Sequence, residues 1–267
     1  MFQWFYQTVF GGISELFASV GSFGTDLFSL PWVQAFLSFF ERFGWAMYLA
    51  GLATAGFGIA LDYQTTGHVS VRRQVLPMGA GLLAAHLLTV VPVRLYVFCC
   101  YLQGIFWKEL ALVSGGTATG DGWASSLLEG MQDTVSVTNL FFLLAVAYCV
   151  LKCVFGNIGR GGILLTQIAV GSLYLFSLPR GNTEGFCLWM KQVIALCLTS
   201  FLQMTLLYLG LITWAENPLL GLGVLIAANE VPRVADRFGL ETGMRTGIGN
   251  LVTHAQTAVR TVKAFAV

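Results

Sequence analysis

The sequence is short of charge. Only 10% of its 267 residues are Asp, Glu, Lys or Arg, whereas 56% are hydrophobic. An ordinary soluble domain has roughly 25% charged residues. The net charge is +1, so the composition indicates no broadly basic surface for nucleic acid. These proportions predict a membrane protein.

Motifs that carry enzyme chemistry are also missing. The sequence has no Walker-type phosphate loop. Its six cysteines lie in or beside apolar runs, and we interpret them as small, buried hydrophobic residues. Cys149 and Cys153 have a spacing that could share a metal, but no third ligand is apparent. The intramembrane polar residues Glu41, His86 and Arg94 form no catalytic or metal set. We therefore expect no catalytic, cofactor-binding or metal-binding residues, and no enzyme.

Long hydrophobic runs are abundant. Residues 192–215 form a stretch of 24 residues without one Asp, Glu, Lys or Arg. As a helix, this stretch would be about 36 Å long, enough to cross a hydrocarbon core of roughly 30 Å. Residues 192–215 are therefore expected to be buried in a bilayer.

The same reasoning predicts an all-α, polytopic membrane protein with about five transmembrane helices. Residues 32–215 form the expected membrane domain, with residues 156–160 as a short turn between the third and fourth spans. The five expected spans are residues 43–61, 75–102, 137–155, 161–178 and 191–215.

The two ends differ from the membrane domain. Apolar residues in positions 1–20 recur every three or four residues, which predicts an amphipathic helix within an interfacial segment, residues 1–31. Residues 216–267 begin with an apolar run from Pro218 that is too short to span. Gly221 and Gly223 suit a bend there, which predicts a re-entrant or interfacial segment. An amphipathic cytoplasmic helix is expected to follow.

Three ionisable residues lie within the apolar segments. Glu41 and Arg94 are expected at the same membrane depth, where they could form an ion pair; alternatively, Arg94 snorkels to the interface. His86 is expected near the midplane. It could be a hydrogen-bonded packing residue or part of a proton relay, although a relay would need further ionisable partners.

Small side chains recur every four residues in the first span, at Ala46, Ala50, Thr54 and Gly58. Such a face allows another helix to approach closely. The partner could be a helix of the same subunit or a helix of a neighbouring subunit.

Basic residues favour the cytoplasmic side of a membrane. Two sets flank the expected spans: Arg72, Arg73, Lys152, Arg160 and five residues of the C-terminal tail on one side, and Lys108, Arg180 and Lys191 on the other. This imbalance predicts an outside N-terminus and a cytoplasmic C-terminus.

Four short segments carry a resemblance to a known family. They are Asp26–Gln34 (DLFSLPWVQ), Phe43–Ala46 (FGWA), Leu61–Gln64 (LDYQ) and Val91–Tyr96 (VPVRLY). Together with their surroundings, roughly residues 10–104, they resemble the TrbL-like membrane subunits of conjugative elements, particularly those of Gram-positive hosts. The resemblance implies a polytopic subunit of a type IV secretion apparatus in the bacterial cytoplasmic membrane.

Family members are thought to form a ring and to help pass single-stranded DNA with its attached relaxase. The resemblance thus implies a homo-oligomeric scaffold or channel. The implied partners are other secretion subunits, a cytoplasmic ATPase, membrane lipids and the DNA–relaxase cargo. Residues 108–136 are a short outer loop compared with larger members. A small-solute permease or export channel is the alternative function, and an intramembrane enzyme is a third.

Overall fold

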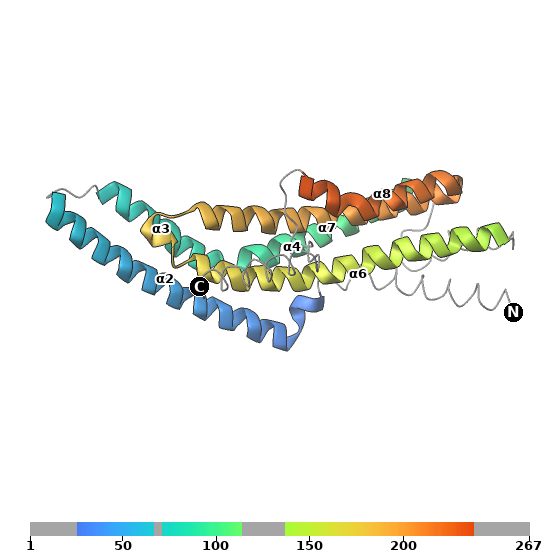
Figure 1. Ribbon diagram of the computed structural model, residues 1–267. Coiled ribbons are helices and arrows are strands. Elements are labelled where there is room, and N and C mark those ends of the chain that lie inside the picture. The colour runs from blue at the N-terminus through green and yellow to red at the C-terminus, as the bar shows by residue number, and fades with distance from the viewer. Residues whose placement is uncertain (1–25, 67–70, 114–136, 238–267) are drawn as a thin grey trace, which may run out of the picture.

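A computed structural model describes residues 26–66, 71–113 and 137–237 (Figure 1). The predicted amphipathic helices near the two termini fall outside these residues. All regular secondary structure in the described ranges is helical, which confirms the all-α prediction there. The elements are α2 (Pro31–Thr66), α3 (Val71–Leu87), α4 (Val90–Val113), α6 (Val137–Tyr174), the 3₁₀ helix η1 (Leu178–Arg180), α7 (Glu184–Glu216) and α8 (Pro218–Arg237).

Five of the described helices are long and apolar enough to cross a membrane. They are α2, α4, α6, α7 and α8. Helices satisfy their backbone hydrogen bonds internally, as a chain in hydrocarbon must. The structure therefore confirms an α-helical, multi-pass membrane protein, although the helices are not the five segments expected from the sequence.

The largest difference concerns α6. The expected turn at residues 156–160 is wrong, because these residues lie inside one continuous helix of 38 residues. From the sequence, two glycines and a charged residue at this point had predicted a break in the helix. In the structure, Arg160 is buried and hydrogen-bonded to α7, so the helix continues through it. The third and fourth expected spans are thus one helix.

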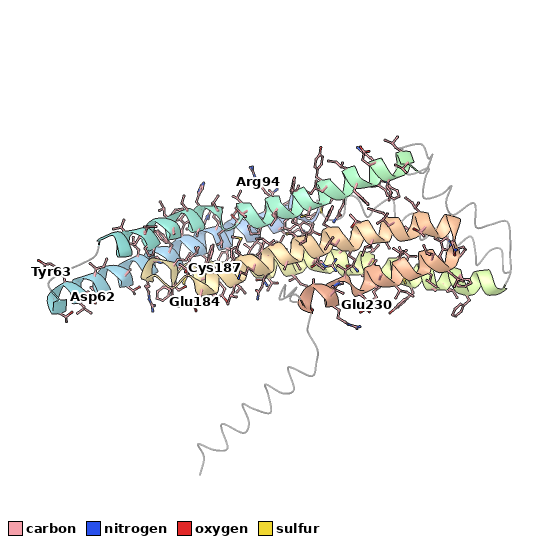
Figure 2. All side chains as sticks on the ribbon, turned by 90° about the horizontal axis from the view of Figure 1, so that it is seen from above. Asp62, Tyr63, Arg94, Glu184, Cys187 and Glu230 are labelled. Carbon is pink, nitrogen blue, oxygen red and sulfur yellow. The ribbon has the colours of Figure 1, made fainter. Side chains whose placement is uncertain are left out.

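The second expected span, residues 75–102, is divided instead. Helix α3 ends at Leu87 and α4 begins at Val90, with Pro92 in the first turn of α4. Proline is tolerated in a first turn because the amide that it lacks would have no helical partner there. Helices α3 and α4 follow one another in the same direction along one side of the bundle (Figures 1 and 2).

Helix α8 packs along α7 after a sharp reversal at Asn217 (Figure 1). Pro218 is its first residue, and Gly221 and Gly223 lie within the continuous helix, so the expected bend is absent. A Cβ atom at Gly221 would collide with the backbone of Trp214. The glycine therefore permits close packing of α8 on α7 rather than a turn.

The end of α2, the start of α3 and η1 lie in the same half of the bundle, and η1 contacts both α2 and α3 (Figure 1). Arg180, in η1, therefore lies in the same half of the bundle as the start of α3, whereas the sequence-based count of basic residues assigned the two to opposite sides. Lys152 and Arg160 are not in a connection either, because both lie within α6. The sequence-based count of basic residues on each side of the membrane assumed a turn at residues 156–160, which the structure lacks.

Two hydrophobic clusters form the core. One joins the first half of α6 with α7 and α8, around Val150, Leu207 and Leu225. The other joins α2, α3 and α4 with the second half of α6 and the first half of α7, around Leu88, Leu164 and Trp189. Helices α6 and α7 contribute to both clusters and so form the central pair of the bundle.

Candidate functional site

A fully buried arginine lies at the centre of the α6–α7 contact. Arg160 has 0% of its surface exposed. Its Nη2 donates a hydrogen bond to Oε1 of Gln203 on α7. Its Nε and Nη1 have no hydrogen-bond partner among the described residues. Because a buried charge is costly unless it is paired or hydrogen-bonded, the amide of Gln203 is an essential partner.

Further polar side chains surround this pair. Ser200 donates a hydrogen bond to Oδ1 of Asn157, and Nε2 of Gln203 donates to Sγ of Cys153 at 3.3 Å. We call Cys153, Asn157, Arg160, Ser200 and Gln203 the polar core. All five side chains are buried.

Helical spacing explains the polar core. Cys153, Asn157 and Arg160 are separated by four and three residues and so share one face of α6. Ser200 and Gln203 share one face of α7 in the same way. The two faces meet along the α6–α7 contact. Interhelical hydrogen bonds of this kind hold membrane helices together and fix their relative rotation.

The polar core extends to α4 and α8. The Tyr96 hydroxyl on α4 donates a hydrogen bond to the Asn157 carbonyl at 3.5 Å. On α8, Oδ1 of Asn229 accepts from Cys153 Sγ at 3.5 Å, and its Nδ2 donates to the Cys149 carbonyl at 3.4 Å. Polar contacts between Cys149 and Arg160 of α6 thus link this helix to α4, α7 and α8.

The two cysteines with metal-ligand spacing are among these residues. Cys149 and Cys153 are both free thiols and both buried. Within residues 26–66, 71–113 and 137–237, no group of three or more His, Cys, Asp or Glu could hold a metal ion.

The structure does not bring Glu41 and Arg94 together. No ion pair joins them in the described chain, where Arg233 and Glu230 of α8 form a different pair at 2.7 Å. Arg94 is exposed near the start of α4, and Figure 2 shows it on the outer edge of the bundle. Glu41 is half-buried on α2. The break between α3 and α4 explains the difference, because it redirects the side chains that follow it.

His86 lies in the last turn of α3 and is exposed. The nearby apolar side chains of Leu83 and Leu87 are exposed as well. His86 is therefore on the outer face of the bundle, where neither a buried packing role nor a relay within one chain is indicated.

The small-residue face of α2 is exposed too. Ala46, Ala50, Thr54 and Gly58 all lie on the outer surface, and a Cβ atom at Gly58 would have no neighbour within 4 Å among the described residues. No described helix of the same chain packs against this face.

Other residues of α2 make the contacts with the rest of the bundle. They are Gly44, Tyr48, Gly51 and Ala55, all buried. The Tyr48 hydroxyl donates a hydrogen bond to the Met78 carbonyl on α3 at 3.0 Å. Sequence spacing identified a small-residue face on α2 but not these contact residues, because small residues occur in both sets.

Comparison with protein families gives one match over the whole chain. Residues 1–267 match a family described as "Conjugal transfer protein TrbL". No curated protein matches the chain, and no solved structure does.

Proposed function

The chain belongs to the TrbL family of conjugal transfer proteins, and on this premise we propose that it is a membrane subunit of a conjugative type IV secretion apparatus. In this role it is a homo-oligomeric scaffold or channel in the bacterial cytoplasmic membrane. It helps single-stranded DNA, carried with its attached relaxase, to cross that membrane. Its own part is structural rather than catalytic.

The observation that carries this proposal is the outer face of α2. Residues Ala46, Ala50, Thr54 and Gly58 have no partner helix in the described chain. Small residues at this spacing are typical of close helix–helix contacts in membranes. A membrane subunit that works by assembly needs such a face, whereas a solitary permease does not.

The polar core also supports a role in assembly, because it makes the subunit rigid. Hydrogen bonds between α6 and α7 and to α4 and α8 fix how these helices pack. A rigid unit presents its outer faces in a constant arrangement, which repeated assembly into a closed ring requires.

A channel for DNA need not be strongly basic. Each Lys or Arg that neutralises a phosphate strengthens binding to DNA. The chain has 14 basic and 13 acidic residues. A weakly charged lining would let a polyanion pass without holding it, so the low charge suits a transient cargo.

The helix directions support a topology with an outside N-terminus and a cytoplasmic C-terminus. Helices α2, α6, α7 and α8 each cross once in this arrangement, and α3 with α4 makes one further crossing (Figure 1). Arg72, Arg73 and Arg180 then lie on the cytoplasmic side and Lys108 lies on the other. This distribution agrees with the preference of basic residues for the cytoplasm. Here α8 is a full span rather than a re-entrant segment.

The proposed partners follow from the role. The subunit would contact other copies of itself, other membrane subunits of the secretion apparatus, a cytoplasmic ATPase and the surrounding lipids. The DNA–relaxase complex would be a passing cargo rather than a bound ligand.

An in-frame deletion of the coding sequence in a donor strain tests the proposal. Transfer of the conjugative element to a recipient should be lost and should return when the intact gene is supplied in trans. A deletion that leaves transfer at the level of the parent strain would contradict the proposed function.

A further inference from the structure

The outer face of α4 carries basic and aromatic side chains in a regular order. Arg94, Tyr101 and Lys108 follow one another at intervals of seven residues, and Phe98 lies one turn after Arg94. Residues seven apart on a helix lie two turns apart on the same side. All four are exposed, Phe98 by 53% and Tyr101 by 66%. We call these four residues the α4 stripe.

The two cations of the α4 stripe have no counter-charge in the described chain. Neither Arg94 nor Lys108 forms an ion pair there. Glu109 is the acidic residue of α4 and is exposed as well. It directly follows Lys108, so it points about 100° away around the helix, and it lies about 22 Å along the helix from Arg94. The α4 stripe itself is therefore basic.

Arg94 lies deep within the crossing that α3 and α4 make together. Lys108 is 14 residues later, about 21 Å along α4, and Arg73 is 21 residues earlier, about 31 Å at the same rise. Both distances exceed what a long basic side chain can cover by snorkelling from near a helix end. A guanidinium at this depth is unfavourable against lipid tails but not against water. The α4 stripe is therefore suited to a water-filled space.

We propose that the α4 stripe lines the water-filled conduit of the assembly and contacts the single-stranded DNA that passes through it. This inference rests on the proposed function and adds the face that meets the cargo. Proteins that bind single strands without sequence preference combine cations for the phosphates with aromatic rings on which bases stack. Arg94 and Lys108 supply the cations, and Phe98 and Tyr101 supply the rings. Two cations neutralise few phosphates, so the contact is weak, as a passing cargo requires.

A depth-matched control for the α4 stripe is present on α7. Leu198 is 41% exposed there. Tyr96 and Ser200 both donate hydrogen bonds to Asn157, so they lie at one depth. Arg94 is two residues before Tyr96, and Leu198 is two residues before Ser200, on helices that run in the same direction (Figure 1). Leu198 therefore lies at about the depth of Arg94 on a different helix.

Thiol labelling of opened native membranes tests whether the α4 stripe faces water. Arg94→Cys and Tyr101→Cys should react with a charged, water-soluble maleimide, whereas Leu198→Cys should not, because the reacting thiolate forms only in water. Each variant is full length in a Cys187→Ser background, whose own labelling is subtracted, since Cys187 is the exposed native cysteine of the described chain. Labelling of the α4 stripe no higher than that of Leu198→Cys would overturn the proposal.

Photo-cross-linking in donor cells tests the contact with DNA. The photoreactive residue p-benzoylphenylalanine replaces Tyr101 in the full-length protein, and in the control it replaces Leu198. During transfer, the probe at position 101 should cross-link to the transferred strand well above the control. Cross-linking to another copy of the chain in place of DNA would overturn the proposal, because this face would then lie between subunits.

Charge variants show whether the cations guide the strand. Arg94→Gln with Lys108→Gln should lower the cross-link yield of the probe at position 101 about tenfold or more, as for one lost contact to a charged group. Arg94→Lys with Lys108→Arg keeps both charges and should preserve the yield. Equal yields from the two double variants would overturn the role of the cations; the helix content of each variant shows that it is folded.

The result is separable from the test of the proposed function. Loss of DNA transfer on deletion, together with no cross-link above the Leu198 control, would mean that the function stands and the α4 stripe is wrong. A labelled α4 stripe, together with unchanged transfer in the deletion strain, would mean that the water-filled face stands and the function is wrong.

Discussion

Arg160 on α6 donates a hydrogen bond to the side-chain amide of Gln203 on α7, and both residues are buried. The two lie 43 residues apart in the chain. A hydrogen bond to a charged group stabilises a protein by about 1.5–3 kcal/mol. The contact fixes α6 against α7 in the middle of the bundle, where a hydrophobic pair would allow more freedom of rotation.

Removing the acceptor should therefore destabilise the protein. Gln203→Leu leaves a buried guanidinium without its described acceptor, and the expected cost is about 3 kcal/mol or more, as for breaking a buried pair. The double variant Arg160→Met with Gln203→Leu should recover most of the loss, because no buried charge remains. Thermal unfolding in detergent, followed by tryptophan fluorescence, measures both variants. A double variant that is less stable than Gln203→Leu alone would contradict this account.

Gly51 and Gly58 lie two turns apart on α2 and should respond differently to the same change, because only Gly51 is buried. A Cβ atom at Gly51 would collide with the backbone of Phe176, whereas one at Gly58 would meet nothing in the described chain. Gly51→Ala should lower the unfolding temperature through strain of about 1–3 kcal/mol. Gly58→Ala serves as the control and should leave monomer stability unchanged or slightly improved. Equal losses in the two variants would contradict the close packing of α2 at Gly51.

Trp189 tests the packing of the first half of α7. Its Nε1 donates a hydrogen bond to the Gln167 carbonyl at 2.6 Å, and its ring packs directly over Gly171. Trp189→Phe should cost about 1 kcal/mol or more, because the bond is lost and the ring is smaller. Trp32→Phe is the matched control, since Trp32 is 62% exposed. A Trp189 variant as stable as the Trp32 variant would contradict the proposed packing.

The revised topology makes a prediction about chemical access. In a Cys187→Ser background, Arg72→Cys and Arg180→Cys should react with a membrane-impermeant maleimide from the same side, because the start of α3 and η1 lie in one half of the bundle. Lys108→Cys should react from the other side. Labelling intact cells and inverted vesicles separates the two sides. Reaction of Arg72→Cys and Arg180→Cys from opposite sides would restore the turn at residues 156–160 and contradict a continuous α6.

The sequence predicted the structure correctly where the composition of a segment alone determines its environment. The uncharged run at residues 192–215 predicted α7, because a helix that long and apolar has few other environments. The break in α6 was predicted wrongly for the opposite reason. Nothing near Arg160 in the sequence shows that Gln203 would accept its hydrogen bond. An arginine without a visible partner was therefore interpreted as part of a loop between two helices.

The polar core could be predicted only in part. Ser200 and Gln203 were recognisable as polar groups on an apolar helix, but their partners depend on how α6 rotates against α7. The face of Ala46 and Gly58 was recognisable by spacing. Whether it meets the same chain or another copy depends on packing, which spacing does not determine.

The mass of the complex extracted in a lipid-preserving detergent tests the central claim most directly, namely that this chain works as a multi-copy membrane subunit. Native mass spectrometry of the full-length protein, 29.0 kDa per chain, should show a closed assembly of several copies. A monodisperse monomer that keeps its helix content would contradict the claim and would favour the alternative of a small-solute permease.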